Sequence, residues 1–206
     1  MKRQWLKRSD TANLILAFGG WALGAAPFGE LTSDGDVLLV DDYNRLDDPL
    51  EELAQYDHVD LVAFSFGVAS AAHWLARTGF QPARLTAISG TLSPAHADKG
   101  IAPDMIRATA DGLCRDSFAK FCRRAGLECP APTINIEAAR AELIAVINRG
   151  PAPEIGFDRI WIPKQDRIIP PSAQETAWSQ QQHAIRRIPG RHVPFRRGQS
   201  WAEWIA

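Results

Sequence analysis

The sequence lacks most features that mark disulfide-stabilised, metal-binding or membrane proteins. Its three cysteines are an odd number and include no Cys-x-x-Cys pair. We therefore predict no disulfide framework, no zinc site and a reduced, cytoplasmic setting. No apolar run approaches the length of a membrane-spanning helix. The net charge of -1 provides no overall field for nucleic acid or an anionic membrane, and we expect neither as a partner.

Targeting and nucleotide-binding patterns are missing as well. The basic N-terminus leads into an apolar stretch at residues 14–18 that is too short for a signal-peptide core. The glycine-rich stretch at residues 18–24 has neither the Gly-x-Gly-x-x-Gly spacing of dinucleotide-binding proteins nor that of a phosphate loop. We found no internal repeat. The length of 206 residues and the 46% of hydrophobic residues suit one globular domain.

Short apolar runs predict the strands of a mostly parallel sheet. Four of them, at 13–18, 37–41, 60–64 and 85–89, are continuous rather than alternating, which is typical of strands covered on both faces. An alanine-rich stretch between two of them predicts a helix at 68–78, and a shorter helix is expected at 49–56. This β-α-β order predicts an α/β fold with helices on both faces of the sheet. The predicted strands are residues 13–18, 37–41, 60–64, 85–89, 159–162 and 184–188.

The strand pattern is interrupted in the middle of the chain. Residues 94–149 contain no convincing strand but three helical patterns, at 103–112, 116–126 and 135–148. We interpret residues 94–150 as a small helical lid inserted into a core made of residues 1–93 and 151–206. In the second part of this core, further helices are expected at 172–182 and 198–205.

Three residues that follow predicted strands suggest a serine hydrolase. Ser65 lies at the end of the apolar run Leu-Val-Ala-Phe-Ser-Phe-Gly, directly before a helix, as in the strand-to-helix turn that exposes an esterase nucleophile. Asp166 and His192 each come just after a later strand. Nucleophile, acid and histidine in this chain order are typical of α/β-hydrolases. Since ligands bind at the carboxyl ends of parallel strands, we expect the three side chains to meet there.

The chemistry assigns a role to each of them. A serine hydroxyl needs a neighbouring base to take its proton, which we expect to be His192, and that base needs an acid to orient it, which we expect to be Asp166. Ala63 stands where the turn usually has its first glycine. Alternatively, Ser65 only caps the following helix. Two other aspartates are poorer candidates for the acid because of their places in the chain, namely Asp98 and Asp158.

The developing oxyanion needs donors, which are usually two backbone N–H groups. One belongs to the residue after the nucleophile, here Phe66. The other comes from the glycine-rich loop after the first strand, where we choose Trp21. The simpler interpretation of this loop is a tight turn with Trp21 packed on the core.

Several motifs together resemble one known family. The Gly-Gly-Trp loop, the Ser65 turn and the ending Gly-x-His-x-Pro-Phe are similar to those of BioG-type pimeloyl-acyl-carrier-protein methyl ester esterases, small α/β-hydrolases of biotin synthesis. So are Ile-Ser-Gly-Thr-Leu-Ser-Pro at 88–94, Gly-Ile-Ala-Pro at 100–103 and Lys-Phe-Cys-Arg-Arg at 120–124. The sequence departs from the family at Phe64 and Phe66, which replace its more usual tryptophan and methionine.

The resemblance implies a reaction and a partner. Ser65 would attack the methyl ester of a pimeloyl chain carried by an acyl carrier protein, methanol would leave, and no metal or organic cofactor would be needed. The lid would offer Lys120, Arg123 and Arg124 to the acidic carrier, although basic helix residues are often only a solvated face. Substrate-binding candidates are Trp21, Phe118 and Phe121, of which the phenylalanines either line an acyl channel or hold the lid down.

Two other functions stay open at this point. The first is a carboxylesterase of broad specificity for small acyl esters, which stays open because one sequence does not define the shape of the substrate pocket. The second belongs to a different class, a non-catalytic binding protein on a hydrolase scaffold.

Overall fold

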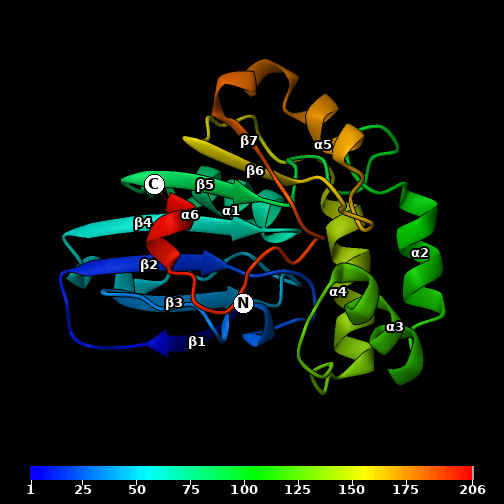
Figure 1. The fold of residues 1–206 in the computed structure, drawn as a ribbon, viewed down its shortest axis with the longest axis horizontal. Helices are drawn as coiled ribbons and strands as arrows, with labels where there is room; N and C mark the ends of the chain where they lie inside the picture. Colours follow the sequence, from blue (N-terminus) through cyan, green and yellow to red (C-terminus); the bar gives the residue numbers. More distant parts are fainter. Residues whose placement is uncertain (206) are drawn as a thin grey trace.

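A seven-stranded, mostly parallel sheet forms the centre of the computed structural model, which describes residues 1–205 (Figure 1). The strand order is β1-β3-β2-β4-β5-β6-β7. Strands β2 to β7 are parallel, and β1 pairs with β3 in the antiparallel direction. The α/β fold predicted from the apolar runs is confirmed. The strands are β1 (Lys2–Lys7), β2 (Asn13–Phe18), β3 (Asp36–Asp41), β4 (His58–Phe64), β5 (Arg84–Ile88), β6 (Arg159–Pro163) and β7 (Ile185–Ile188).

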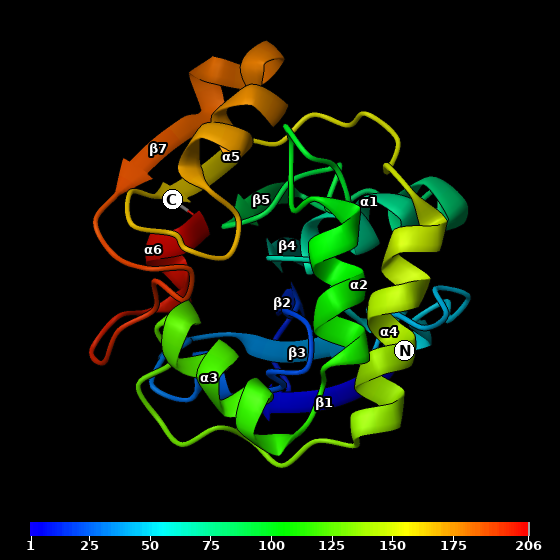
Figure 2. The ribbon, with the colours of Figure 1, turned by 90° about the vertical axis from the view of Figure 1, so that its right-hand side faces the viewer.

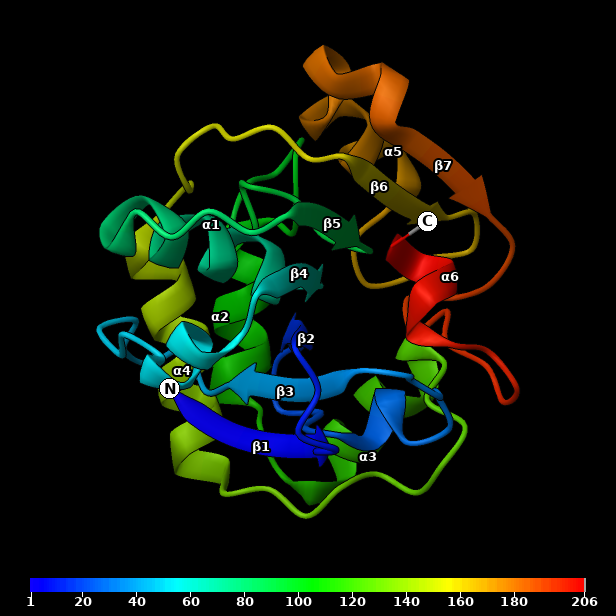
Figure 3. The ribbon, with the colours of Figure 1, turned by 90° about the vertical axis from the view of Figure 1, so that its left-hand side faces the viewer.

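Both faces of the sheet are covered, by elements of very different size. Successive strand residues point to opposite faces, so that Leu14 and Leu16 of β2 pack with helix α1 (Gly67–Thr78), whereas Ala17 packs on the other side. There the cover consists of the short helix α6 (Trp201–Ile205), the 3-10 turn η1 (Ala26–Phe28) and several aromatic side chains. Figure 3 shows α1 and α6 on opposite sides of β4.

The three helices predicted for residues 94–150 are present and lie together beyond one end of the sheet (Figures 1 and 2). They are α2 (Pro103–Asp111), α3 (Arg115–Ala125) and α4 (Ile136–Arg149). We call this part the helical segment. Within residues 1–205, no helix has the length and the apolar character that crossing a membrane would require.

The structure differs from the sequence predictions in three places. Strand β1 was not predicted. The helix expected at 49–56 is the 3-10 helix η2 (Glu51–Gln55). The single helix expected at 172–182 is divided into α5 (Pro171–Ala177) and the 3-10 helix η3 (Ser179–Ala184), which meet at Trp178.

Helix α4 is bonded to the loop that follows β3. The Glu142 carboxylate accepts a hydrogen bond of 3.2 Å from the Tyr43 N–H, and the Arg149 guanidinium donates to the Tyr43 carbonyl. The Tyr43 hydroxyl in turn lies 2.8 Å from the carbonyl oxygen of Gly19. The helical segment is therefore connected to the glycine-rich loop after β2 through one tyrosine.

Glu142 should make the stability of the fold depend on pH. It is 5% exposed, and burial raises the pKa of its carboxyl from the ordinary 4.5 to about 7. Between these values the folded chain holds a proton that the unfolded chain has lost, so stability falls as pH rises. At about 1.4 kcal/mol per pH unit, the loss over this window is about 3 kcal/mol. The neutral variant Glu142→Gln keeps the acceptor for Tyr43 and should lack this loss.

The measurement is the free energy of unfolding from pH 4 to pH 8.5 for the wild type and Glu142→Gln. We expect the variant to be more stable than the wild type at pH 8 and the two to converge toward pH 4. Glu137→Gln, which changes an exposed carboxylate on the same helix, is the matched control and should follow the wild type. If the free energy of unfolding changed with pH in the same way for the wild type and Glu142→Gln, the raised pKa of Glu142 would not be the cause of the pH dependence.

Candidate active site

Ser65 lies on a sharp turn between β4 and α1. Its φ of 57° is in the left-handed region, which few residues other than glycine adopt. The Ser65 N–H donates to the carbonyl of Ile88 at 2.9 Å, which continues the strand pairing to the turn itself. A Cβ at Gly67 would lie 2.4 Å from the carbonyl oxygen of Phe18. The turn therefore requires glycine at 67, because α1 begins directly against β2.

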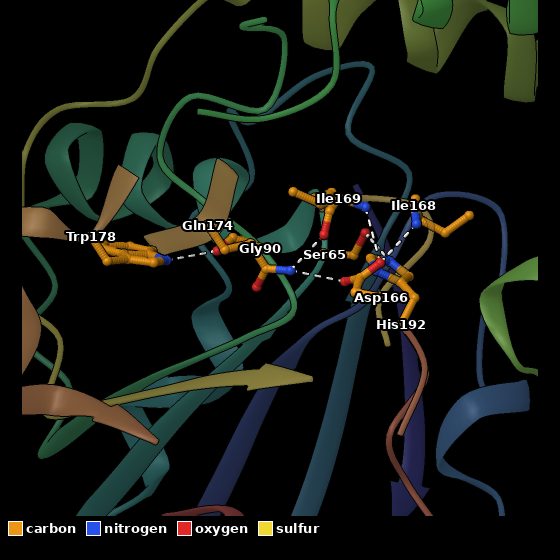
Figure 4. Close-up of polar contacts among 8 residues, drawn as sticks. All are labelled: Ser65, Gly90, Asp166, Ile168, Ile169, Gln174, Trp178 and His192. Carbon is orange, nitrogen blue, oxygen red and sulfur yellow. Dashed lines mark hydrogen bonds and ion pairs between the residues drawn. The ribbon is translucent and has the colours of Figure 1, made fainter. Parts of the chain in front are cut away.

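The three residues singled out in the sequence are hydrogen-bonded in series (Figure 4). The Ser65 hydroxyl lies 2.9 Å from Nε2 of His192, and Nδ1 of His192 lies 2.8 Å from Oδ2 of Asp166. All three are buried, with exposed fractions of 6% for Ser65, 1% for His192 and 5% for Asp166. This geometry allows a proton to pass from the hydroxyl to the imidazole while the carboxylate holds the ring.

The loop after β6 holds the Asp166 carboxylate in place. Oδ1 accepts the backbone N–H groups of Ile168 at 2.8 Å and Ile169 at 3.0 Å. A buried carboxylate is costly unless it is hydrogen-bonded, and these donors stabilise its ionised form. They also leave Oδ2 to face His192.

The His192 loop is attached to the helical segment. The N–H of Val193, the next residue, donates to the carbonyl of Ala125 at the end of α3 with a length of 2.8 Å. The ring of Phe64, directly before the nucleophile, lies 5.2 Å from the imidazole between ring centroids. Helix α3 and the strand end thus fix the histidine from two sides.

The other acidic candidates lie elsewhere. The Asp158 carboxylate accepts the N–H of Leu85 at 2.8 Å, at the beginning of β5 and hence at the opposite end of the sheet. Asp98 is exposed in the connection before α2. Neither contacts the imidazole of His192 in the described residues.

Two backbone N–H groups near Ser65 have no acceptor within residues 1–205, and they belong to Trp21 and Phe66. Phe66 follows the nucleophile, and Trp21 belongs to the loop after β2. Both residues line the same cavity as Ser65. Free N–H groups at this place are what an oxyanion requires.

The cavity beside Ser65 has a volume of about 70 Å³ and is bounded by the sheet ends and by α2, α3 and α4. Phe121 lines it. Phe118 does not, but its ring contacts that of Trp21 edge-on, with the centroids 5.8 Å apart. The Trp21 indole also donates to the carbonyl of Ala139 on α4 at 2.8 Å. Trp21 therefore forms a wall of the cavity and a contact that holds the helical segment. The complete lining is Trp21, Ser65, Phe66, Ile101, Met105, Ile106, Thr109, Phe121, Arg124, Leu143, Arg167 and Ile168.

Cations surround this cavity. Lys120, Arg123 and Arg124 of α3 are exposed, and none of them forms an ion pair in the described part of the chain. Arg124 lines the cavity together with Arg167, which follows the catalytic aspartate candidate. Among residues 1–205, no three histidine, cysteine or acidic side chains are grouped as metal ligands would be.

The sequence analysis overlooked two residues at this site. Arg167 stands beside Asp166 in the sequence, so the predicted site itself was a signal for it. Gln174 of α5 is fully buried and donates to Asp166. A glutamine on a short helix is usually exposed, and nothing in the sequence separates Gln174 from its neighbours.

Comparisons with known proteins agree with the fold and with an ester hydrolase. Residues 1–204 match the family model described as pimeloyl-ACP methyl esterase BioG. The crystal structure of BioG from Haemophilus influenzae superimposes with a TM-score of 0.89 at 27% identity and covers 100% of both chains. A lipase-esterase related protein from Clostridium acetobutylicum has a TM-score of 0.66 at 12% identity over 93% of this chain and 92% of its own, which shows the shared fold alone.

A curated relative combines a similar region with much additional sequence. The malonyl-[acyl-carrier protein] O-methyltransferase of Bacteroides fragilis is 30% identical over 191 residues, which are 86% of this chain. The chain spans only 39% of the length of that relative.

Proposed function

The chain belongs to the pimeloyl-ACP methyl esterase BioG family of carboxylic ester hydrolases, and we propose that it hydrolyses the methyl ester of a pimeloyl chain bound to an acyl carrier protein. The observation that carries this proposal is the hydrogen-bonded series from Ser65 through His192 to Asp166. The family match and the ester-hydrolase site support the same reaction.

The reaction proceeds in two halves. The Ser65 hydroxyl oxygen attacks the ester carbonyl carbon as Nε2 of His192 takes its proton, and the resulting oxyanion accepts the N–H groups of Trp21 and Phe66. The C–O bond to the methoxy group then breaks, and His192 returns the proton so that methanol leaves. A water molecule, deprotonated by His192, attacks the acyl-enzyme and releases the carboxylate and Ser65. Asp166 stays ionised and stabilises the imidazolium.

The helical segment serves as a lid in this proposal. Residues 94–150 cover the cavity beside Ser65, whereas residues 1–93 and 151–205 form the core. Phe121 contacts the acyl chain and Phe118 supports Trp21 from behind. The lining is largely apolar apart from Arg124 and Arg167, and this suits an alkyl chain with a methyl ester at its end.

The experiment that tests the function compares two substrates. Turnover of a carrier-bound pimeloyl methyl ester is measured against that of a short nitrophenyl ester, with Ser65→Ala as the control for background hydrolysis. We expect a higher kcat/KM on the carrier-bound ester. Equal or better efficiency on the short ester would instead favour a broad-specificity carboxylesterase.

The exposed cations of α3 should matter for the carrier. Acyl carrier proteins are acidic, and unpaired lysines and arginines beside the cavity would steer such a partner. We expect Arg123→Glu to raise KM for the carrier-bound ester about tenfold at low salt and to leave kcat and the short ester unaffected. Because salt screens exposed charges, the effect should shrink at high ionic strength.

A charge-matched control separates docking from net charge. Arg77→Glu makes the same change near the end of α1 that points away from Ser65. Its KM should stay near that of the wild type at every salt concentration. Equal effects of the two variants would show that overall charge, rather than the α3 surface, determines KM.

A further inference from the structure

Gln174 is a fully buried side chain whose two amide protons are both used at the active site. Its exposed fraction is 0%. Nε2 donates to Oδ2 of Asp166 at 2.9 Å and to the carbonyl of Ile169 at 2.8 Å (Figure 4). The remaining amide oxygen is buried and has no hydrogen-bond partner within residues 1–205.

The orientation of this amide follows from its neighbours. If nitrogen and oxygen were exchanged, the oxygen would face two other acceptors, the carboxylate and the carbonyl. The observed orientation leaves one acceptor unsatisfied, which costs stability. The side chain is thus arranged for donation to Asp166 at the expense of its own oxygen.

Gln174 and His192 share one oxygen of the carboxylate. Oδ2 receives both the Gln174 amide and Nδ1 of His192, whereas Oδ1 receives only backbone N–H groups. The amide therefore contacts the very atom that orients the imidazole. A neutral donor at this atom reduces the negative charge that the ring faces.

Helix α5 is bonded to the loop after β5, which packs against the turn that carries the nucleophile. The indole of Trp178, at the end of α5, donates to the carbonyl of Gly90 at 2.9 Å. A Cβ at Gly90 would lie 2.4 Å from the carbonyl oxygen of Ser65. Gly90 therefore links the helix that carries Gln174 to the turn that carries Ser65.

We propose that Gln174 is a positioning residue for ester hydrolysis, which holds the Asp166 carboxylate and sets how strongly it favours the protonated imidazole. The inference rests on the proposed roles of Ser65, His192 and Asp166. Without the amide donor, Oδ2 carries more negative charge toward His192. The imidazole then keeps its proton to higher pH, and the acid limb of the pH profile of kcat/KM moves upward.

Three arginines of the loops and helix around the site do not titrate between pH 5 and pH 9. Arg124 comes from α3, Arg167 from the loop after β6, and Arg191 precedes the histidine. Guanidinium groups stay charged throughout an assay between pH 5 and pH 9. Glu142 of α4 titrates near neutral pH, but its carboxyl contacts Tyr43. Its effect on the pH profile should therefore be the same in the wild type and in variants that leave Glu142 unchanged.

The test compares two glutamine-to-methionine variants. Gln174→Met preserves side-chain length and removes the donor. Gln181→Met removes a glutamine that binds only backbone groups, those of Phe157 and Ile155 at 2.8 Å each. We expect Gln174→Met to lower kcat about tenfold with little change in KM. Its acid limb should move to higher pH, whereas Gln181→Met should lose thermal stability and keep the wild-type profile.

A second variant and a second readout keep the result decisive. Gln174→Glu has the same shape, and beside the ionised Asp166 its buried carboxyl should hold a proton and donate one hydrogen bond, so its acid limb should lie between those of the wild type and Gln174→Met. The NMR titration of the ¹⁵N-labelled His192 ring needs no turnover and should move in the same order. If the wild type is active but neither readout separates Gln174→Met from Gln181→Met, the positioning role is wrong. An inactive wild type with the expected shift in the NMR titration would contradict only the proposed function.

Discussion

Ser65→Ala should lower kcat for the pimeloyl methyl ester at least about 10³-fold and leave the fold intact. The substitution removes the oxygen that lies 2.9 Å from Nε2 of His192. Alanine has the same Cβ as serine, so the strained φ of 57° at this position costs both residues the same. The variant should therefore lose activity and keep the stability of the wild type. Kinetic assays and thermal unfolding of one preparation measure the two quantities.

Ser70→Ala is the matched control for this result. Ser70 is also buried, and its hydroxyl donates to the carbonyl of Phe66 at 2.9 Å, but it points into α1 rather than toward the histidine. A fluorophosphonate probe should label the wild type and Ser70→Ala but not Ser65→Ala. A wild type that takes up no label would favour a non-catalytic binding protein on this scaffold.

The strands that are buried on both faces could be predicted from the sequence. Strands β2, β3, β4 and β5 were predicted from continuous apolar runs, and the observed β2 has the predicted bounds, Asn13–Phe18. Strand β1 has no such run, because it lies at the edge of the sheet and its first residues are exposed. Its pairing with β3 is a long-range event that composition does not reveal.

The division of the predicted helix at 172–182 has a local cause. The chain closes two tight turns around Trp178, and Gln181 has a φ of -120°, outside the helical region. The indole of Trp178 must reach the carbonyl of Gly90, and the Gln181 side chain must reach the backbone on either side of Phe157. Tertiary contacts of this kind override a helical pattern in the sequence.

The positions of the catalytic candidates were easier to predict than the groups that support them. In a parallel sheet, residues after the strands meet at one edge, so chain order was sufficient to select Ser65, Asp166 and His192. Gln174 and Glu142 are polar helix residues whose side chains are buried and hydrogen-bond inside the protein. Which helix face is buried depends on how α4 and α5 pack, and a single glutamine or glutamate carries no sign of it.

The contacts of the helical segment suggest how it supports the reaction. The Trp21 indole donates to the carbonyl of Ala139, and the N–H of Val193 in the His192 loop donates to the carbonyl of Ala125. One helix is thus bonded to the predicted oxyanion loop and another to the loop of the predicted base. Removal of residues 94–150 would take away both supports, so the segment is part of the site's framework as well as its cover.

Asp166→Asn should lower kcat about 10⁴-fold, through the tautomer of His192 rather than through lost packing. Oδ1 accepts the N–H groups of Ile168 and Ile169, so an asparagine must keep its oxygen there. Its NH₂ group then takes the place of Oδ2 and faces two donors, the Gln174 amide and Nδ1–H of His192. The ring relieves this conflict by moving its proton to Nε2, the nitrogen that should accept the proton of Ser65.

The same substitution at a second aspartate provides the control. Asp98 is exposed and lies before α2, and Asp98→Asn should keep the wild-type kcat. The two variants are compared in kcat for the methyl ester and in the NMR signal of the proton on Nδ1 of His192, which Asp166→Asn should abolish. Near-normal turnover of Asp166→Asn together with an inactive Asp98→Asn would transfer the role of the acid. Because the NH₂ group of the asparagine faces both the Gln174 amide and Nδ1 of His192, adding Gln174→Met should relieve only part of the defect: the ring would still carry its proton on Nε2, where it cannot accept the proton of Ser65.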